Sequence, residues 1–231
     1  MNMKELLSNY YFDLTNISFK DLFQNKKCWE SLGDTLKKYI QKHLTSEIRG
    51  KIHDGAYIIG DNIFIDEGTV VEPGAYIIGP TIIGKNCEIR HGAYIRGNVL
   101  VGNACVIGHA TEIKSSIMLN NAKAGHFAYI GDSILGNNVN LGAGTKCANL
   151  KVVEGNVHVK INEKNFDSGL RKLGAIIGDH TEIGCNSVTS PGTLIGKNSI
   201  IYSCSVTRGF YPEDSIIKLR QNLDIIQRTK P

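Results

Sequence analysis

Aliphatic residues recur along this chain at a constant interval of six. Ten of them follow one another without a break: Ile59, Ile65, Val71, Ile77, Ile83, Ile89, Ile95, Val101, Ile107 and Ile113. Neither the period of an α-helix, about 3.6 residues, nor the alternation of a strand produces this interval. Each hexad is therefore expected to hold one short strand and one corner of a repeating coil. The pattern predicts a β-solenoid.

The interval of six returns, shifted in phase, in the second half of the chain. It continues at Leu135, Leu141, Ile177, Ile183, Ile195 and Ile201, with Thr189 in the remaining slot. Between Cys147 and Lys172 the hexads vanish, and Val152 to Asn162 alternates like a pair of strands. We expect an insertion over about 147–172 that projects from the coil, and such loops often carry binding residues.

Residues between the aliphatic positions suit tight corners. Asn86 and Asn198 follow a Gly-Lys pair after an aliphatic residue, and both Gly and Asn tolerate the left-handed backbone of a sharp turn. Cys87 and Cys105 lie eighteen residues apart at small inward positions. A turn of three hexads would stack them in the core of adjacent turns, about 4.8 Å apart. The pattern resembles the hexapeptide-repeat left-handed β-helix family, and this resemblance implies the handedness, a three-sided section and trimers.

Both ends of the chain show helical spacing instead. Residues 1–52 are predicted to form a helical cap over an open end of the coil, or alternatively a dimer-like contact, in which Trp29, Leu36 and Ile40 lie on one side. The coil is expected over 53–210. Residues 211–231 are predicted to form a second amphipathic helix with Pro212 in its first turn.

Composition and charge limit the kinds of ligand that this chain is expected to bind. The 231 residues carry a net charge of +4, without an aromatic and basic stripe that would favour nucleic acid. No apolar window is long enough for a membrane span, and no secretory signal begins the chain. The six cysteines lack metal-site spacing. We expect a cytoplasmic protein that binds a small anionic molecule and no metal.

Two cations occupy equivalent positions one turn apart. Arg96 follows Ile95, and Lys114 follows Ile113, so the side chains would stand about 5 Å from each other. A phosphate between them would remove the repulsion. The alternative is that both side chains turn into solvent.

His126 lies in a stretch that breaks the register directly after this pair. Histidine can take a proton from an amine or hydroxyl near neutral pH, although a histidine in a turn is more often structural. Asn140 and Asn149 follow in the next turns. Asparagines commonly stabilise solenoid corners, so alone they indicate little.

The order of these motifs is more specific than the hexads. The runs Lys123-Ala124-Gly125-His126, Asn138 to Thr145 and Ala148-Asn149 resemble the acetyltransferase domain of the bacterial bifunctional glucosamine-1-phosphate acetyltransferase/N-acetylglucosamine-1-phosphate uridyltransferase. The insertion and the run Gly169 to Asp179 are more similar to archaeal-type sugar-1-phosphate nucleotidylyltransferases with the same coil. The resemblance covers roughly residues 55–210.

This resemblance implies a role for each matching residue. His126 matches the general base that deprotonates the sugar's amino group, and Asn149 matches a residue that assists the transfer. The expected substrate contacts are Arg96, Lys114, Tyr129, Asn140 and Lys172. The expected contacts with acetyl-CoA are Ala143, Cys185 and Ser203, of which the last two depart from the usual residues. The resemblance also implies a homotrimer with its active sites between subunits.

Three functions remain open at this stage. The first is acetyl-CoA-dependent N-acetylation of an amino-sugar 1-phosphate. The second is a zinc carbonic anhydrase, suggested by His91, His109 and His126 but lacking that family's closely spaced histidine pair. The third is a non-catalytic or regulatory scaffold related to UDP-N-acetylglucosamine pyrophosphorylases. Residues 1–50 hold no Gly-rich nucleotide loop, so we expect no nucleotidyl transfer from this chain alone.

Overall fold

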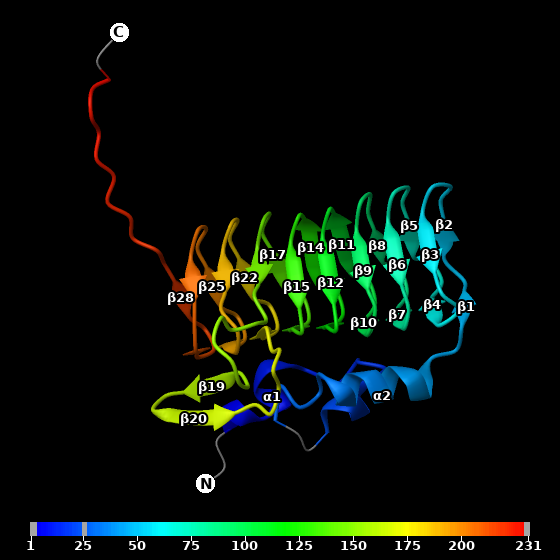
Figure 1. Ribbon diagram of the computed structural model, residues 1–231, viewed down its shortest axis with the longest axis horizontal. Coiled ribbons are helices and arrows are strands. Elements are labelled where there is room, and N and C mark those ends of the chain that lie inside the picture. Colours follow the sequence, from blue (N-terminus) through cyan, green and yellow to red (C-terminus); the bar gives the residue numbers. More distant parts are fainter. Residues whose placement is uncertain (1–3, 25–26, 229–231) are drawn as a thin grey trace.

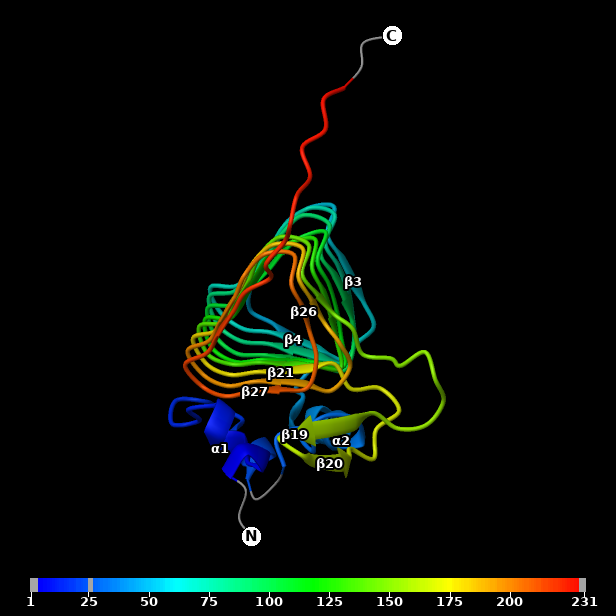
Figure 2. The same cartoon turned by 90° about the vertical axis from the view of Figure 1, so that its left-hand side faces the viewer.

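The chain winds into a three-sided parallel coil with a second layer along one side (Figures 1 and 2). The computed structural model describes residues 4–24 and 27–228. Within these residues, successive strands take the three sides in turn, and each strand pairs in parallel with the strand one turn away. The predicted β-solenoid is confirmed.

We number the sides of the coil as three faces. The first face comprises β1 (Glu47–Ile48), β4 (Ile63–Ile65), β7 (Thr81–Ile83), β10 (Val99–Val101), β13 (Ile117–Met118), β16 (Ile134–Leu135), β21 (Ala175–Ile177), β24 (Thr193–Ile195) and β27 (Phe210–Tyr211). The second face comprises β2 (Lys51–Ile52), β5 (Val70–Val71), β8 (Glu88–Ile89), β11 (Val106–His109), β14 (Lys123–His126), β17 (Asn140–Leu141), β22 (Glu182–Ile183), β25 (Ile200–Ile201) and β28 (Ile216–Ile217). The third face comprises β3 (Tyr57–Ile59), β6 (Tyr76–Ile78), β9 (Tyr94–Arg96), β12 (Glu112–Lys114), β15 (Tyr129–Gly131), β18 (Lys146–Cys147), β23 (Val188–Thr189) and β26 (Val206–Thr207).

The aliphatic column forms the core of the coil. Every member from Ile65 to Ile113 is buried, and so are the later members, including Thr189. Ile59 is the exception, because the first turn is one residue longer and Ile58 pairs with Ile77 in its place. Cys87 and Cys105 are buried and stacked as predicted, with the Cys105 amide donating to Cys87 Sγ. Asn86 and Asn198 have positive φ at their corners, as expected.

The N-terminal segment covers a side of the coil, not its end. It holds η1 (Lys4–Leu6), α1 (Ser8–Tyr11), η2 (Lys20–Phe23) and α2 (Asp34–His43). Its apolar side chains share one core with outward residues of the first face: Leu100, Ile117, Ile134, Ile176 and Leu194. The prediction of an end cap was therefore wrong, because the apolar outer surface of the first face has to be covered along its length. The boundary at 52 was also late, since β1 begins the coil at Glu47.

The insertion leaves the coil after β18 and returns at β21. It contains an antiparallel hairpin of β19 (His158–Ile161) and β20 (Lys164–Asp167). The inward side of this hairpin, with Val157, Val159 and Ile161, joins the N-terminal layer. The segment that leads from the coil into this hairpin stands out from the coil (Figure 2). Its residues Val152 and Val153 are both exposed.

The predicted C-terminal helix is absent from the part of the tail that the structure describes. Residues up to Ile217 complete the last turn, and 218–228 leave the coil without helix or strand (Figure 1). A short isolated helix is marginal in water unless its apolar side is buried. None of the residues 4–24 and 27–228 buries Leu223, Ile225 or Ile226, so the amphipathic pattern alone does not produce a helix there. No helix among residues 4–24 and 27–228 is long and apolar enough to cross a membrane.

Removing residues 219–231 is expected to leave the stability of the coil unchanged. Leu223, Ile225 and Ile226 are 83 %, 99 % and 86 % exposed and Leu219 is 45 % exposed, so truncation removes little packing from the described residues. We expect the free energy of unfolding by urea to stay within about 0.5 kcal/mol of the full chain. A loss above about 1 kcal/mol would show that the tail packs on the coil or on another copy.

Candidate functional site

A hollow on the second face contains the histidine singled out by the sequence. His126 ends β14 and lies beside Asn140, Gly142 and Ala143 in an open depression of about 600 Å³. Lys123 contributes a cation to the same hollow. Asn140 donates a hydrogen bond from Nδ2 to Glu182 Oε2 at 2.9 Å, so the next turn orients its amide.

His126 differs from the two histidines that precede it along the corner. Nδ1 of His91 lies 2.7 Å from the carbonyl of Pro73, and Nδ1 of His109 lies 3.1 Å from the carbonyl of His91. These two rings stack with 5.6 Å between centroids. The His126 imidazole is exposed and has no hydrogen-bond partner among the described residues, so both its nitrogens are open to a ligand.

The predicted coenzyme contacts follow His126 along one corner of the coil. This corner joins the second and third faces, and backbone hydrogen bonds connect its successive turns. The amide of Gly144 donates to the carbonyl of His126, and the amide of Asn186 to that of Ala143. Cys185 and the next-turn residue Ser203 are both exposed there. The fold therefore brings His126, Ala143, Cys185 and Ser203 into one line.

The third face carries a polar network built on Asp132. Lys114 Nζ donates to Asp132 Oδ2 at 2.5 Å, and Asn149 donates to the same oxygen from Nδ2. Tyr129 Oη lies 3.4 Å from Asn149 Oδ1. Burial, followed by the nearby carboxylates of Glu112 and Asp132, raises the pKa of Tyr129 above its usual value. The phenol thus stays protonated and acts as a hydrogen-bond donor.

Each of the two stacked cations has a carboxylate of its own. Arg96 Nη1 lies 2.7 Å from Glu112 Oε1, while Lys114 is bound to Asp132. These carboxylates remove the repulsion from which a bound phosphate was inferred, so stacking alone no longer argues for an anion. Arg96 still keeps 43 % of its side chain exposed, whereas Lys114 keeps 15 %. Arg96 is the more accessible of the two.

Sequence reasoning missed Asp132 and Glu112. Asp132 follows Lys114 by eighteen residues, the same interval that stacks Lys114 on Arg96. However, the strands pair Lys114 with Gly131 at an interval of seventeen, so Asp132 reaches Lys114 from the next position and counting turns does not identify the contact. Glu112 was hidden, because it reaches Arg96 from the neighbouring position opposite Tyr94.

Lys172 lies where the insertion returns to the coil. An antiparallel bridge joins it to Leu150, and the amide of Leu173 donates to the carbonyl of Asn149. Lys172 and Arg171 line a hollow together with Asp132. The insertion therefore places an exposed cation beside the polar network of the third face.

One chain divides the predicted site between two faces. His126 and Asn140 line the hollow of the second face, whereas Tyr129 and Asn149 line a separate hollow of the third face. The exposed ring of Phe127 lies at the corner between them, with its centroid 6.0 Å from that of His126. Among the described residues, no group of three or more His, Cys, Asp or Glu side chains is arranged to hold a metal ion. His91 and His109 instead serve the backbone of the corner.

Comparisons with known proteins agree with this architecture. Residues 77–164 match the family described as the GMPPB C-terminal domain. A solved UDP-N-acetylglucosamine acyltransferase from Campylobacter jejuni superposes with a TM-score of 0.50 at 18 % identity, covering 70 % of this chain and 69 % of that one. At that identity the likeness concerns the fold. The chain is a left-handed β-helix of hexapeptide repeats.

Sequence relatives identify the group more closely. The bifunctional protein GlmU of Methanococcus maripaludis strain S2 is 37 % identical over 199 residues, which cover 84 % of this chain and 48 % of that protein. The bifunctional sugar-1-phosphate nucleotidylyltransferase/acetyltransferase of Sulfurisphaera tokodaii is 45 % identical over 85 residues, 37 % of this chain and 21 % of that protein. The resemblance to the β-helix part of these bifunctional proteins is confirmed. The chain spans about half the length of the GlmU proteins it matches.

Proposed function

We propose that this chain is an acyltransferase that moves the acetyl group of acetyl-CoA to the amino group of an amino-sugar 1-phosphate. The observation that carries the proposal is the exposed, unpartnered imidazole of His126 at the head of the line formed by Ala143, Cys185 and Ser203. Similarity to the bifunctional GlmU proteins supports the same chemistry. The product would be a precursor of nucleotide sugars.

His126 is the proposed general base. The sugar nitrogen attacks the carbonyl carbon of the thioester, so that a carbon–nitrogen bond forms and the carbon–sulfur bond breaks. The imidazole takes the proton released by the amine and passes it to the departing thiolate, which leaves as coenzyme A. Acyl-CoA would lie along the corner past Ala143, Cys185 and Ser203.

A second copy of the chain is proposed to complete the site. His126 and Asn149 lie on different faces, and the amide of Asn149 is held by Asp132 and Tyr129. A homotrimer in which the second face of one copy meets the third face of the next would bring the two hollows together. Tyr129, Asn140 and Asn149 would then hold the amino sugar between subunits.

The phosphate of the substrate is proposed to bind Arg96 and Lys172, and the less exposed Lys114 supports them. Replacing Arg96 with alanine is expected to raise KM for the sugar phosphate about tenfold or more and to leave KM for acetyl-CoA within about twofold, since a charge-assisted contact contributes about 1.5–3 kcal/mol. Steady-state kinetics with each substrate varied in turn measures both. Glu112→Gln is the matched variant, because it removes the carboxylate that competes for Arg96 and is expected to lower KM for the sugar phosphate. Equal changes in both KM values would show that Arg96 serves the fold.

The test of the proposal is release of coenzyme A. Purified protein would be incubated with acetyl-CoA and, separately, glucosamine-1-phosphate, galactosamine-1-phosphate or UDP-linked amino sugars. Release with one of the 1-phosphates above the rate without acceptor supports the proposal. Release only with a UDP-linked sugar would change the substrate class, and no release with any acceptor would favour the non-catalytic scaffold.

A further inference from the structure

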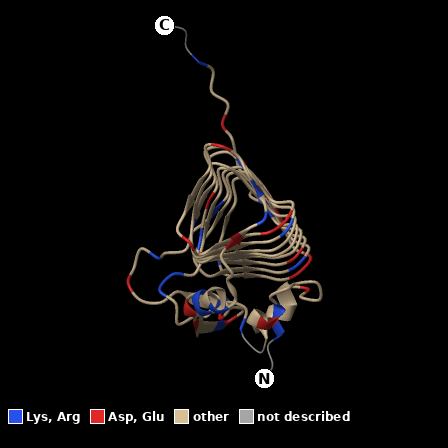
Figure 3. Ribbon diagram, turned by 90° about the vertical axis from the view of Figure 1, so that its right-hand side faces the viewer, with Lys and Arg blue, Asp and Glu red and all other residues tan. Residues whose placement is uncertain are grey.

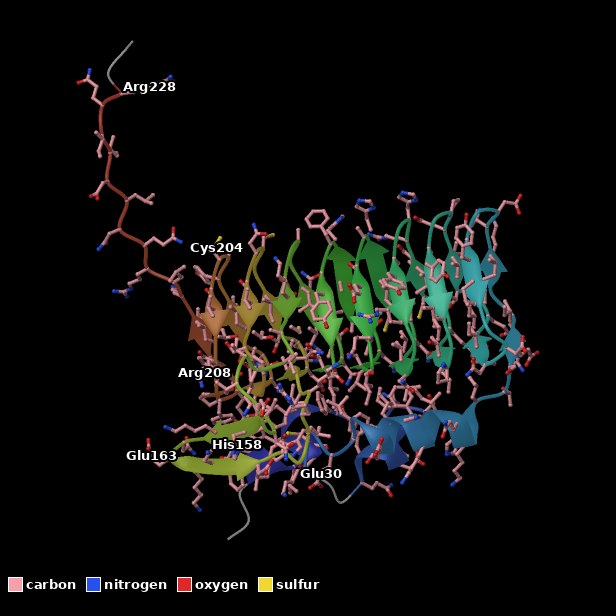
Figure 4. The ribbon with its side chains drawn as sticks, viewed as in Figure 1. Glu30, His158, Glu163, Cys204, Arg208 and Arg228 are labelled. Carbon is pink, nitrogen blue, oxygen red and sulfur yellow. The ribbon has the colours of Figure 1, made fainter. Side chains whose placement is uncertain are left out.

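A further hollow lies between the insertion and the last turns of the coil. Its volume is about 1000 Å³. The corner residues Ser190, Pro191 and Gly192 line it from the coil, and residues of the β19–β20 hairpin line it from the insertion. In Figure 4, Arg208 on the coil side lies above the hairpin that carries His158 and Glu163.

Basic side chains surround this hollow. Lys151, His158, Lys160 and Arg208 line it, and only one carboxylate, that of Glu163, does so. Glu163 is 98 % exposed and reaches Lys160 at 3.9 Å, which is a weak contact. The side chains of Lys151, His158 and Arg208 have no hydrogen-bond or ion-pair partner within 4–24 and 27–228.

The hairpin carries one more carboxylate, that of Asp167, which accepts hydrogen bonds from other groups. Asp167 pairs with His158 across the hairpin but does not line the hollow. It accepts hydrogen bonds from the amide of Gly169 and from Asn156. Elsewhere on the coil, basic and acidic residues are interspersed (Figure 3), and cations such as Lys85 and Arg90 are paired with a carboxylate. The hydrogen bond from the Gly169 amide, together with the charges of His158 and Lys151, lowers the pKa of Asp167, so this carboxylate partly balances those two side chains. The lining itself still carries more positive than negative charge, with Lys151, Lys160 and Arg208 against Glu163.

The remaining wall is apolar and open to solvent. Leu150, Val152 and Val153 line the hollow and are 49 %, 104 % and 66 % exposed. Exposed aliphatic side chains beside unpaired cations suit a ligand that has an anionic part and an apolar or aromatic body. The cations come from the loop, the hairpin and the coil, so they surround a volume larger than one phosphate needs.

We propose that this hollow binds a small molecule with two linked phosphates and a flat or apolar body, of which a nucleoside diphosphate, free or joined to a sugar, is the simplest example. The phosphates would lie between Arg208 and the lysines Lys151 and Lys160, since Arg provides a planar fork for phosphate oxygens and Lys a point charge. The body would lie against Leu150, Val152 and Val153. This hollow adjoins the hollow of the third face, since Leu150 lines both, but its cations are not among the residues assigned to acetyl transfer.

Isothermal titration calorimetry of the full chain tests the proposal. UDP, UDP-N-acetylglucosamine and inorganic pyrophosphate would each be titrated at constant ionic strength. We expect UDP to bind with a dissociation constant below about 1 mM and more tightly than pyrophosphate. Tighter binding of UDP-N-acetylglucosamine than of UDP would identify the sugar nucleotide as the ligand, and the reverse would identify the free diphosphate.

Substitutions of lining residues test whether UDP binds in this hollow. Arg208→Ala and Lys151→Ala are each expected to weaken UDP binding at least about tenfold, because each removes a charge-assisted contact. The control is Lys85→Ala, which removes an exposed lysine bound to Glu67 on a distant turn and should leave the affinity unchanged. No heat from UDP, equal affinity for pyrophosphate, or unchanged binding in Arg208→Ala and Lys151→Ala with native circular dichroism would each overturn the proposal.

Discussion

Replacing His126 with alanine is expected to lower kcat/KM for acetyl transfer by about 10² to 10⁴, the usual contribution of a general base. The imidazole is exposed and makes no hydrogen bond within the described chain, so its removal opens no cavity. The melting temperature should therefore stay close to that of the parent. Coenzyme A release measured on the same preparation as thermal unfolding separates loss of chemistry from loss of structure.

His109→Ala is the matched control for this experiment. His109 lies one turn away, opposite His126 in the pairing of β11 with β14, and stacks on His91. Its ring binds a backbone carbonyl, so we expect a small loss of stability and a rate close to that of the parent. Near-normal turnover in folded His126→Ala protein would show that another group accepts the proton.

Replacing Trp29 with alanine is expected to lower the free energy of unfolding by about 3–5 kcal/mol, the cost of a large cavity in a packed core. Trp29 is 1 % exposed and belongs to the core between the N-terminal layer and the first face. Its ring centroid lies 6.5 Å from that of Phe166 in the hairpin. The loss therefore weakens the contact between the layer and the insertion. Urea unfolding followed by circular dichroism measures it.

Tyr57→Ala provides an aromatic control on the third face. Tyr57 is 55 % exposed and contacts Tyr76 with 5.8 Å between ring centroids, so we expect its removal to cost less than about 1 kcal/mol. A similarly small loss for Trp29→Ala would contradict the view that the N-terminal layer is a structural part of the coil. Phenylalanine at position 29 should recover much of the loss by filling most of the cavity.

The two predictions concern opposite sides of the coil. The first face is covered by the chain's own N-terminal layer and hairpin. The other two faces remain open and carry the predicted catalytic and substrate residues. Covering one face leaves the corner between the other two accessible to a ligand and to another copy.

Sequence alone determined the coil and the position of its interruption. An interval of six specifies which residues point inward, and stacking at a constant period then specifies which residues lie beside one another. For this reason Cys87 and Cys105, the corner asparagines and the stacking of Lys114 next to Arg96 were predictable. Asp132 lies one position beyond Gly131, the residue that pairs with Lys114, so its contact with Lys114 and its role as the centre of a network needed the side chains.

Only the tertiary structure decided what covers the coil and what remains open. The sequence carried a signal for the N-terminal layer, since Leu100, Ile117, Ile134, Ile176 and Leu194 make the outer side of the first face apolar. The sequence did not indicate which segment covers that side. Helical spacing shows that a helix has an apolar stripe, but it does not show the surface against which the stripe packs. The C-terminal segment has a similar stripe and forms no helix where the structure describes it, since no surface of the described residues buries it. Local patterns repeat with the coil and can be counted, whereas packing between distant segments depends on which surfaces meet in space.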